Sequence, residues 1–181
     1  MTLTIDLVPH LDAGDRKAWP GDQDERPLTE LGRRQALALA DALGAEPVDA
    51  LYSGPALRCQ QTLAPLAERL GLEVTVLAEL GEETWRPPEG WSEGPGGGYV
   101  GAFAAGSVLA ALNRIRADHP QGRVIVCSHG HTIPTLAAFL AAAYGLEGVP
   151  ESTQRGQWYR VRRSDAQVRV DLRQAPPGFP T

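Results

Sequence analysis

Short apolar runs alternate with amphipathic helical segments along most of the chain. The expected strands are 3–8, 48–52, 73–77 and 123–127, and the expected helices are 29–44, 55–70, 103–118 and 132–144. This alternation predicts an α/β fold, a three-layer α/β/α sandwich with a mostly parallel central sheet and helices on both faces. In sheets of this kind, ligands bind beyond the carboxyl ends of the strands.

Two later runs, 158–162 and 167–172, are expected to pair as a β-hairpin. The chain has 181 residues, of which 43% are apolar, and this is enough for one domain with a sizeable core. We therefore expect a single domain over residues 1–173. Residues 174–181 form a Pro-rich tail for which we expect no structural role.

Composition excludes several classes of partner. The formal net charge is −5 and no basic run stands out, which argues against nucleic acid or an anionic membrane as a partner. No apolar stretch approaches the roughly 20 residues of a membrane span, and the N-terminus lacks the basic start of a secretory signal. We expect a cytoplasmic protein. Cys59 and Cys127 form no Cys-x-x-Cys pair, which favours reduced thiols.

Polar residues that suit catalysis stand where the expected strands end. His10, Ser53, Glu82 and His129 all occupy such positions. Because the carboxyl ends of parallel strands meet at one edge of a sheet, these side chains are expected to gather there. The sequence thus predicts one candidate site, independently of any motif.

The same segments also carry a family pattern. A strand delivers His10 directly after Pro9, and a second strand ends in Ser-His-Gly at His129. Between them, the spacing Ser-x-x-x-x-Arg-x-x-x-Thr is met by Ser53, Arg58 and Thr62. Together these features resemble the histidine phosphatase (phosphoglycerate mutase-like) superfamily over roughly residues 3 to 145.

A finer likeness lies in the loop after the first histidine. Ala13-Gly14 near its start and Arg26-Pro27-Leu28 near its end are similar to the short, phosphohistidine phosphatase-like branch of the superfamily. The resemblance implies hydrolysis of a small anionic or phosphorylated substrate, without metal or other cofactor.

The resemblance assigns a role to each motif residue. His10 is the implied nucleophile, since a neutral imidazole can attack phosphorus and form a phosphohistidine intermediate. His129 contacts the transferred phosphoryl group, and Arg58 grips its oxygens with a fork of donors. Gly130 opens a helix whose backbone N–H groups face an anion. Glu82 is the implied general acid.

Some of these assignments have rivals in the sequence. Glu79 and Glu83 flank the proposed acid, and all three carboxyls also suit a solvated acidic turn. His129 and His131 form a His-x-His pair that could hold a metal, although the helix that begins there disfavours this interpretation.

The family signature begins Arg-His, and here Pro9 replaces that arginine. Proline donates no backbone or side-chain hydrogen bond, and loss of one preorganised donor typically costs on the order of 100- to 1,000-fold in rate. Arg16, Lys17 and Arg26 lie in the following loop and are candidate replacement cations.

Three functions follow from this pattern. The first is a metal-independent phosphatase with an atypical anion pocket. The second is a repurposed acid-base enzyme acting on a substrate without a phosphoryl group, and the third is a non-catalytic binding module. Trp85, Trp91 and Tyr99, in the Gly/Pro-rich segment after the proposed acid, are candidates either for stacking on a substrate or for anchoring that segment.

Overall fold

A central mixed sheet organises the molecule. The computed structural model describes residues 2–81, 97–149, 154–164 and 167–181, with the side chains of residues 97–105 left out of the description. In this described part, a six-stranded sheet has the order β3-β2-β4-β1-β5-β6. The strands are β1 (Leu3–Pro9), β2 (Ala50–Ser53), β3 (Val74–Val76), β4 (Gly122–Ser128), β5 (Trp158–Arg163) and β6 (Val168–Arg173).

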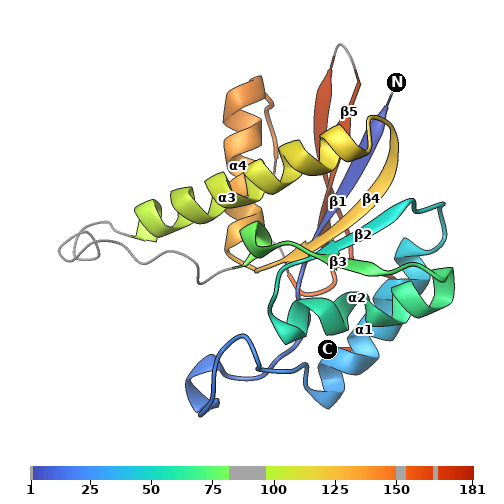
Figure 1. Ribbon diagram of the computed structural model, residues 1–181, viewed down its shortest axis with the longest axis vertical. Coiled ribbons are helices and arrows are strands. Elements are labelled where there is room, and N and C mark those ends of the chain that lie inside the picture. Colours follow the sequence, from blue (N-terminus) through green and yellow to red (C-terminus); the bar gives the residue numbers. More distant parts are fainter. Residues whose placement is uncertain (1, 82–96, 150–153, 165–166) are drawn as a thin grey trace.

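The first four strands are parallel, and the hairpin of β5 and β6 adds an antiparallel edge next to β1. Helices cover both faces (Figure 1). The helices are α1 (Glu30–Leu43), α2 (Leu57–Leu70), α3 (Gly97–Asp118) and α4 (Thr132–Tyr144), with short 3-10 turns η1 (Arg16–Ala18) and η2 (Ala78–Leu80). The expected three-layer α/β fold is confirmed.

Alternation along β1 produces two apolar cores. Leu3, Ile5 and Leu7 pack with residues of α3 and α4, whereas Val8 points to the face covered by α1 and α2. This period of two is what a strand buried on both faces requires. None of the described helices is both long enough and apolar enough to span a membrane.

Helix boundaries follow local chemistry, with two differences from expectation. Thr29 caps α1 as expected, since its side chain accepts a hydrogen bond from the backbone N–H of Gly32. Helix α2 begins at Leu57 and not at Pro55, because Ala56 keeps an extended ψ of 131°. Helix α3 begins at Gly97, six residues before the expected start at residue 103. Glycine is tolerated there because first-turn N–H groups need no helical partner.

The C-terminal tail contradicts the expectation that it has no structural role. Phe179 packs against the core cluster on the α1 and α2 face. The side-chain amide of Gln35 donates to the carbonyl of Pro180 at 2.9 Å. An aromatic ring and one backbone acceptor are enough to fix a short Pro-rich segment, because proline reduces the entropy lost on ordering.

A buried carboxylate joins three neighbouring strands. Asp6 in β1 is fully buried and accepts hydrogen bonds from Arg123 of β4 and Arg160 of β5, with Nε to oxygen distances of 2.8 and 2.7 Å. Trp158 adds an indole N–H at 3.1 Å. The hydrogen bond to Asp6 raises the pKa of Arg160. The charge of the carboxylate is therefore balanced by two guanidinium groups that are themselves buried.

This ion cluster also closes one end of a helix. Nη1 of Arg123 donates to the carbonyl of Leu43, the last residue of α1, at 2.8 Å, and to the carbonyl of Glu46 at 3.0 Å. The last carbonyls of a helix have no partner within it, so a cation there satisfies acceptors and complements the helix dipole.

Replacing Asp6 by alanine is expected to lower the free energy of unfolding by about 3–5 kcal/mol, because buried Arg123 loses its counter-charge and buried Arg160 keeps only its pair with the half-exposed Glu46. Urea unfolding followed by circular dichroism measures this. The control is Asp41→Ala, which breaks an exposed pair with Arg69 and is expected to cost less than about 1 kcal/mol. Equal decreases in the free energy of unfolding for the two variants would show that the buried ion cluster contributes no more than an exposed pair.

Candidate functional site

Two histidines meet where the central strands end. Pro9 of β1 is paired with Ser128 of β4, so the next residue of each strand is a histidine. The backbone N–H of His10 donates to the carbonyl of Ser128 at 2.9 Å, which continues the ladder for one more step. The ring centroids of His10 and His129 are 5.6 Å apart in an edge-on arrangement. The register of β1 and β4 thus brings these two imidazoles together.

The ring of His10 is held in one tautomer. Its Nδ1 lies 2.8 Å from the carbonyl oxygen of Leu11. A carbonyl only accepts, so Nδ1 carries the proton of the neutral ring and Nε2 carries the lone pair. Burial and, to a smaller extent, the positive charges of Arg58, Arg155 and Arg26 together lower the pKa of His10 to about 4, although the hydrogen bond to the Leu11 carbonyl acts in the opposite direction. At neutral pH the ring is a neutral base with a lone pair on Nε2.

Arg58 is deeply buried beside the second histidine. It is 1% exposed, its Nη1 donates to the carbonyl of Gln23, and its Nη2 lies 3.3 Å from Nδ1 of His129. A guanidinium only donates, so Nδ1 of His129 accepts and a neutral ring carries its proton on Nε2. The two histidines therefore have opposite tautomers, one with a lone pair on Nε2 and the other with a donor there.

Thr62 links the helix of Arg58 to the loop after His10. Its hydroxyl donates to the carbonyl of Arg58 at 2.8 Å and accepts from the backbone N–H of Leu11 at 3.2 Å. The motif spacing from Arg58 to Thr62, four residues on a helix, is the spacing that this bond requires.

The segment leading to Glu82 is tied to the end of β4. The hydroxyl of Ser128 donates to the carbonyl of Leu80 at 2.8 Å. A Cβ at Gly54 would come within 2.6 Å of the same carbonyl oxygen, so the close approach requires glycine. Ser53 donates to its neighbour Gly54 at 2.9 Å. The described chain therefore reaches Gly81 next to the strand that ends in His129.

Several expected site residues lie outside the described part of the chain. These are Glu82, Glu83, Trp85 and Trp91, together with the side chain of Tyr99. Glu79, the remaining rival acid, is described. Its carboxylate is 42% exposed and lies 3.9 Å from Arg114 of α3.

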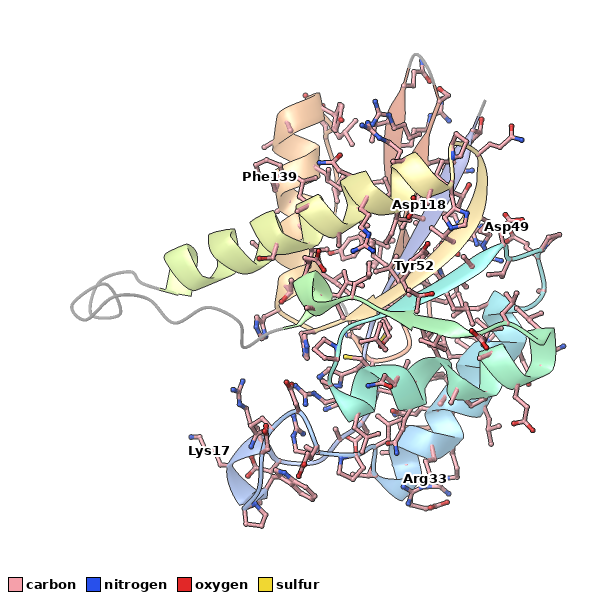
Figure 2. All side chains as sticks on the ribbon, in the orientation of Figure 1. Lys17, Arg33, Asp49, Tyr52, Asp118 and Phe139 are labelled. Carbon is pink, nitrogen blue, oxygen red and sulfur yellow. The ribbon has the colours of Figure 1, made fainter. Side chains whose placement is uncertain are left out.

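The candidate replacement cations differ in position. Arg26 is buried, and its Nη1 donates to the carbonyls of Ala13 and Gly14 at 2.7 and 3.1 Å. Arg16 and Lys17 lie in the exposed turn η1. Figure 2 shows Lys17 on the outside of this turn, pointing away from the sheet.

Arg155 is a nearby cation that the sequence did not indicate. It precedes β5, and its Nη2 lies 3.2 Å from Oδ1 of Asp12, two residues after His10. Its charge is among those that lower the pKa of His10. No motif or spacing marks it, because β5 reaches β1 only through antiparallel pairing from a distant part of the sequence.

Helix α4 begins immediately after the second histidine. The carbonyl of His129 accepts the backbone N–H of Ile133 at 3.1 Å, and His131 is the N-terminal cap residue. The rings of His129 and His131 stack with centroids 6.4 Å apart. Among the described residues, no group of three or more His, Cys, Asp or Glu side chains could hold a metal ion.

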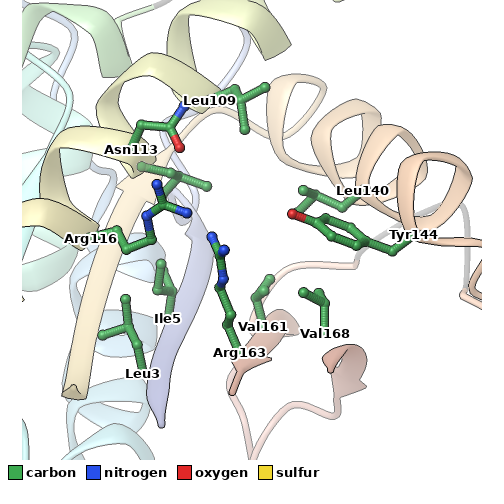
Figure 3. A pocket seen from close by; sticks show the side chains of 11 residues that line it. Leu3, Ile5, Leu109, Asn113, Arg116, Leu140, Tyr144, Val161, Arg163 and Val168 are labelled. Carbon is green, nitrogen blue, oxygen red and sulfur yellow. The ribbon is translucent and has the colours of Figure 1, made fainter. Parts of the chain in front are cut away.

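A separate pocket lies far from this site. It opens between α3, α4 and the β1–β5 side of the sheet, where Arg116 and Arg163 extend over an apolar wall (Figure 3). Leu3 and Ile5, at the start of β1, contribute to that wall. Since β1 has 7 residues, the pocket lies roughly 20 Å from His10. It is not part of the histidine site.

Comparison with known proteins shows a similarity to histidine phosphatases. A family model described as "Histidine phosphatase superfamily (branch 1)" matches residues 13–94. The 8-oxo-(d)GTP phosphatase of Mycolicibacterium smegmatis is 28% identical over 92% of this chain and 46% of that protein. The chain therefore spans about half the length of this relative.

Solved structures share the fold. Bacillus stearothermophilus YhfR superposes with a TM-score of 0.72 and 16% identity, covering 96% of this chain and 98% of that one. The protein histidine phosphatase SixA, solved with tungstate, gives a TM-score of 0.63 and 22% identity, covering 94% of each chain. These matches confirm the resemblance to the histidine phosphatase superfamily, and the solved structures with this fold include phosphatases and a phosphoglycerate mutase.

His10 is expected to titrate near pH 4, well below the ordinary value of 6.5, because its site is desolvated and surrounded by cations. Ring ¹⁵N NMR measures both this pKa and the Nδ1–H tautomer. Below about pH 6.5 the unfolded chain takes up a proton that the folded protein does not bind, so stability falls as the pH drops toward 4. His10→Asn should lack this part of the pH dependence. A His10 pKa at or above 6.5 would show that the ring is neither desolvated nor disfavoured by neighbouring cations.

Proposed function

We propose that this protein is a metal-independent phosphatase that hydrolyses a phosphomonoester or a phosphohistidine through a covalent intermediate on Nε2 of His10. The observation that carries the proposal is the hydrogen bond from Nδ1 of His10 to the carbonyl of Leu11, 2.8 Å long, within a ring of cations. It leaves a neutral imidazole with its lone pair on Nε2 where an anionic substrate is attracted.

In the first step Nε2 of His10 bonds to phosphorus and the bond from phosphorus to the leaving oxygen breaks. The leaving oxygen takes a proton from a carboxylic acid, for which Glu82 is our candidate. In the second step water attacks the phosphorus, the carboxylate takes a proton from that water, and the P–N bond breaks. Inorganic phosphate leaves and the neutral imidazole is restored.

The proposal of Glu82 as the acid is supported by its neighbours. The bond from Ser128 to Leu80 holds the preceding segment beside the strand that ends in His129. Glu79 is a weaker candidate, because its exposed carboxylate lies near Arg114. An acid of this kind is kept protonated by negative charge, which a bound phosphoryl group supplies.

Charge developing on the phosphoryl oxygens needs preorganised donors. Arg58 is one, and its burial makes each hydrogen bond stronger than in water. His129 offers Nε2–H, and Gly130, which was expected to open the helix, offers a backbone N–H two residues before α4 begins. Since β4 ends level with β1, His129 lies beside His10, and Arg58 contacts His129.

The substrate class proposed is a small phosphorylated compound, in keeping with the names of the relatives. One relative is named an 8-oxo-(d)GTP phosphatase and another is a protein histidine phosphatase. Trp85, Trp91 and Tyr99 are candidates for contacting the part of the substrate that leaves. They follow the proposed acid directly in the sequence.

Pro9 supports a second candidate function, that of a binding module or of an acid-base enzyme for a substrate without phosphate. It stands where the family signature has an arginine, and it is buried at the end of β1. An anion pocket with one cation fewer binds phosphate less tightly unless another group replaces it.

Hydrolysis of a generic aryl phosphate distinguishes these functions. We expect turnover by the natural protein and a loss of more than about 1,000-fold in kcat/KM for His10→Ala, because no nucleophile remains. Acid-labile phosphate on His10, trapped by rapid quenching and located by mass spectrometry, is the second readout.

His119→Ala is the matched control. This histidine bonds to Tyr52 at 2.9 Å near the C-terminal end of α3, so its loss should leave turnover unchanged. Turnover by Pro9→Arg but not by the natural protein would refute the phosphatase proposal and favour the second candidate function.

A further inference from the structure

We propose that Arg155 supplies the phosphoryl-binding guanidinium that Pro9 cannot, so that the anion pocket has been rebuilt from the turn before β5. This inference rests on the proposed function and extends it to a residue that neither the sequence pattern nor the family match, which covers residues 13–94, indicates.

A fixed carboxylate positions this guanidinium at the mouth of the site. Asp12 follows His10 by two residues, and its Oδ1 lies 3.2 Å from Nη2 of Arg155. Its Oδ2 accepts from the hydroxyl of Thr29 at 2.5 Å, and its backbone N–H donates to Gln35 at 3.1 Å. Because both ends of Asp12 are held by α1 and its cap, the ion pair directs Arg155 toward the loop that bears His10.

The turn that carries Arg155 is supported by a backbone hydrogen bond and by the C-terminal tail. The N–H of Gln157 donates to the carbonyl of Gln154 at 3.0 Å, and Gly156 has a φ of +83°, which favours glycine at this place in a turn. A Cβ on Gly156 would lie 2.6 Å from ring atoms of Phe179. The C-terminal tail therefore packs directly against the turn that carries Arg155.

Arg155 also differs from the other two cations near His10. Arg26 donates to two backbone carbonyls, and Arg58 donates to one carbonyl and to His129. Arg155 is 47% exposed and its described partner is one carboxylate oxygen. A guanidinium has five N–H donors in a planar fork, so it can keep this ion pair and still bind two phosphoryl oxygens.

The ion pair has a second effect on an incoming anion. Asp12 alone would repel a phosphoryl group bound near His10, and Arg155 neutralises that charge. Loss of Arg155 would therefore weaken anion binding in two ways, by direct contact and by exposing Asp12. These two effects are separable by a double variant.

The experiment compares aryl phosphate hydrolysis and orthovanadate binding by calorimetry in the natural protein, Arg155→Ala and Arg162→Ala. Arg162 is the matched control, since it is 46% exposed and paired with Asp171 on the hairpin of β5 and β6. We expect Arg155→Ala to lower kcat/KM by about 100- to 1,000-fold and to weaken vanadate binding in parallel. Arg162→Ala should change neither by more than about twofold.

Two further variants test the mechanism. Adding Pro9→Arg to Arg155→Ala restores the family arginine and should recover activity. If that double variant does not fold, guanidinium ion added to Arg155→Ala should recover activity instead. The double variant Arg155→Ala, Asp12→Asn should still bind vanadate weakly, because it lacks the guanidinium that contacts the anion. Recovery of vanadate binding in this second double variant would mean that Arg155 only masks Asp12, and the inference would be wrong.

The outcomes separate the inference from the function on which it rests. If the natural protein turns over and depends on His10, but Arg155→Ala keeps its activity and its vanadate affinity, only the inference falls. If the natural protein neither turns over nor binds vanadate, the proposed function falls and the inference with it.

Discussion

The buried carboxylate of Asp6 constrains how the three central strands align. Arg123 from β4 and Arg160 from β5 reach it from opposite sides of β1, so a shift of one residue would turn the carboxylate to the wrong face of the sheet and leave both cations without it. The same alignment ends β1 and β4 at the same level. His10 and His129 then follow paired residues and face each other.

Electrostatics in the site serve binding and reactivity together. A site that gathers cations around an imidazole attracts anions and at the same time disfavours the protonated ring. The low pKa of His10 results first from burial and then from these cations, and it keeps the imidazole neutral at neutral pH. Arg58, Arg155 and Arg26 are the positive charges that act on this ring.

Much of the fold was predictable because it depends on local patterns. Alternating apolar runs predicted the layers, and the Thr29 cap predicted where α1 begins. Polar residues at the ends of strands predicted that His10 and His129 lie in one site. Features that depend on distant contacts were not predictable. Asp6 is a lone charge within an apolar run, and Arg155 has no motif and acquires its position only when β5 pairs with β1. The tail was misjudged because its packing depends on Phe179 meeting a turn formed elsewhere.

The contact between Phe179 and the turn at Gly156 also imposes an order of events during synthesis. A ribosome delivers the chain from its N-terminus, and early segments can fold before later ones emerge. Once the segment through β4 and His129 has left the ribosome, both histidines are present. The turn before β5 acquires its aromatic support only after Phe179 has also left the exit tunnel. His10 and His129 can therefore come together before the turn that carries Arg155 has gained its aromatic support.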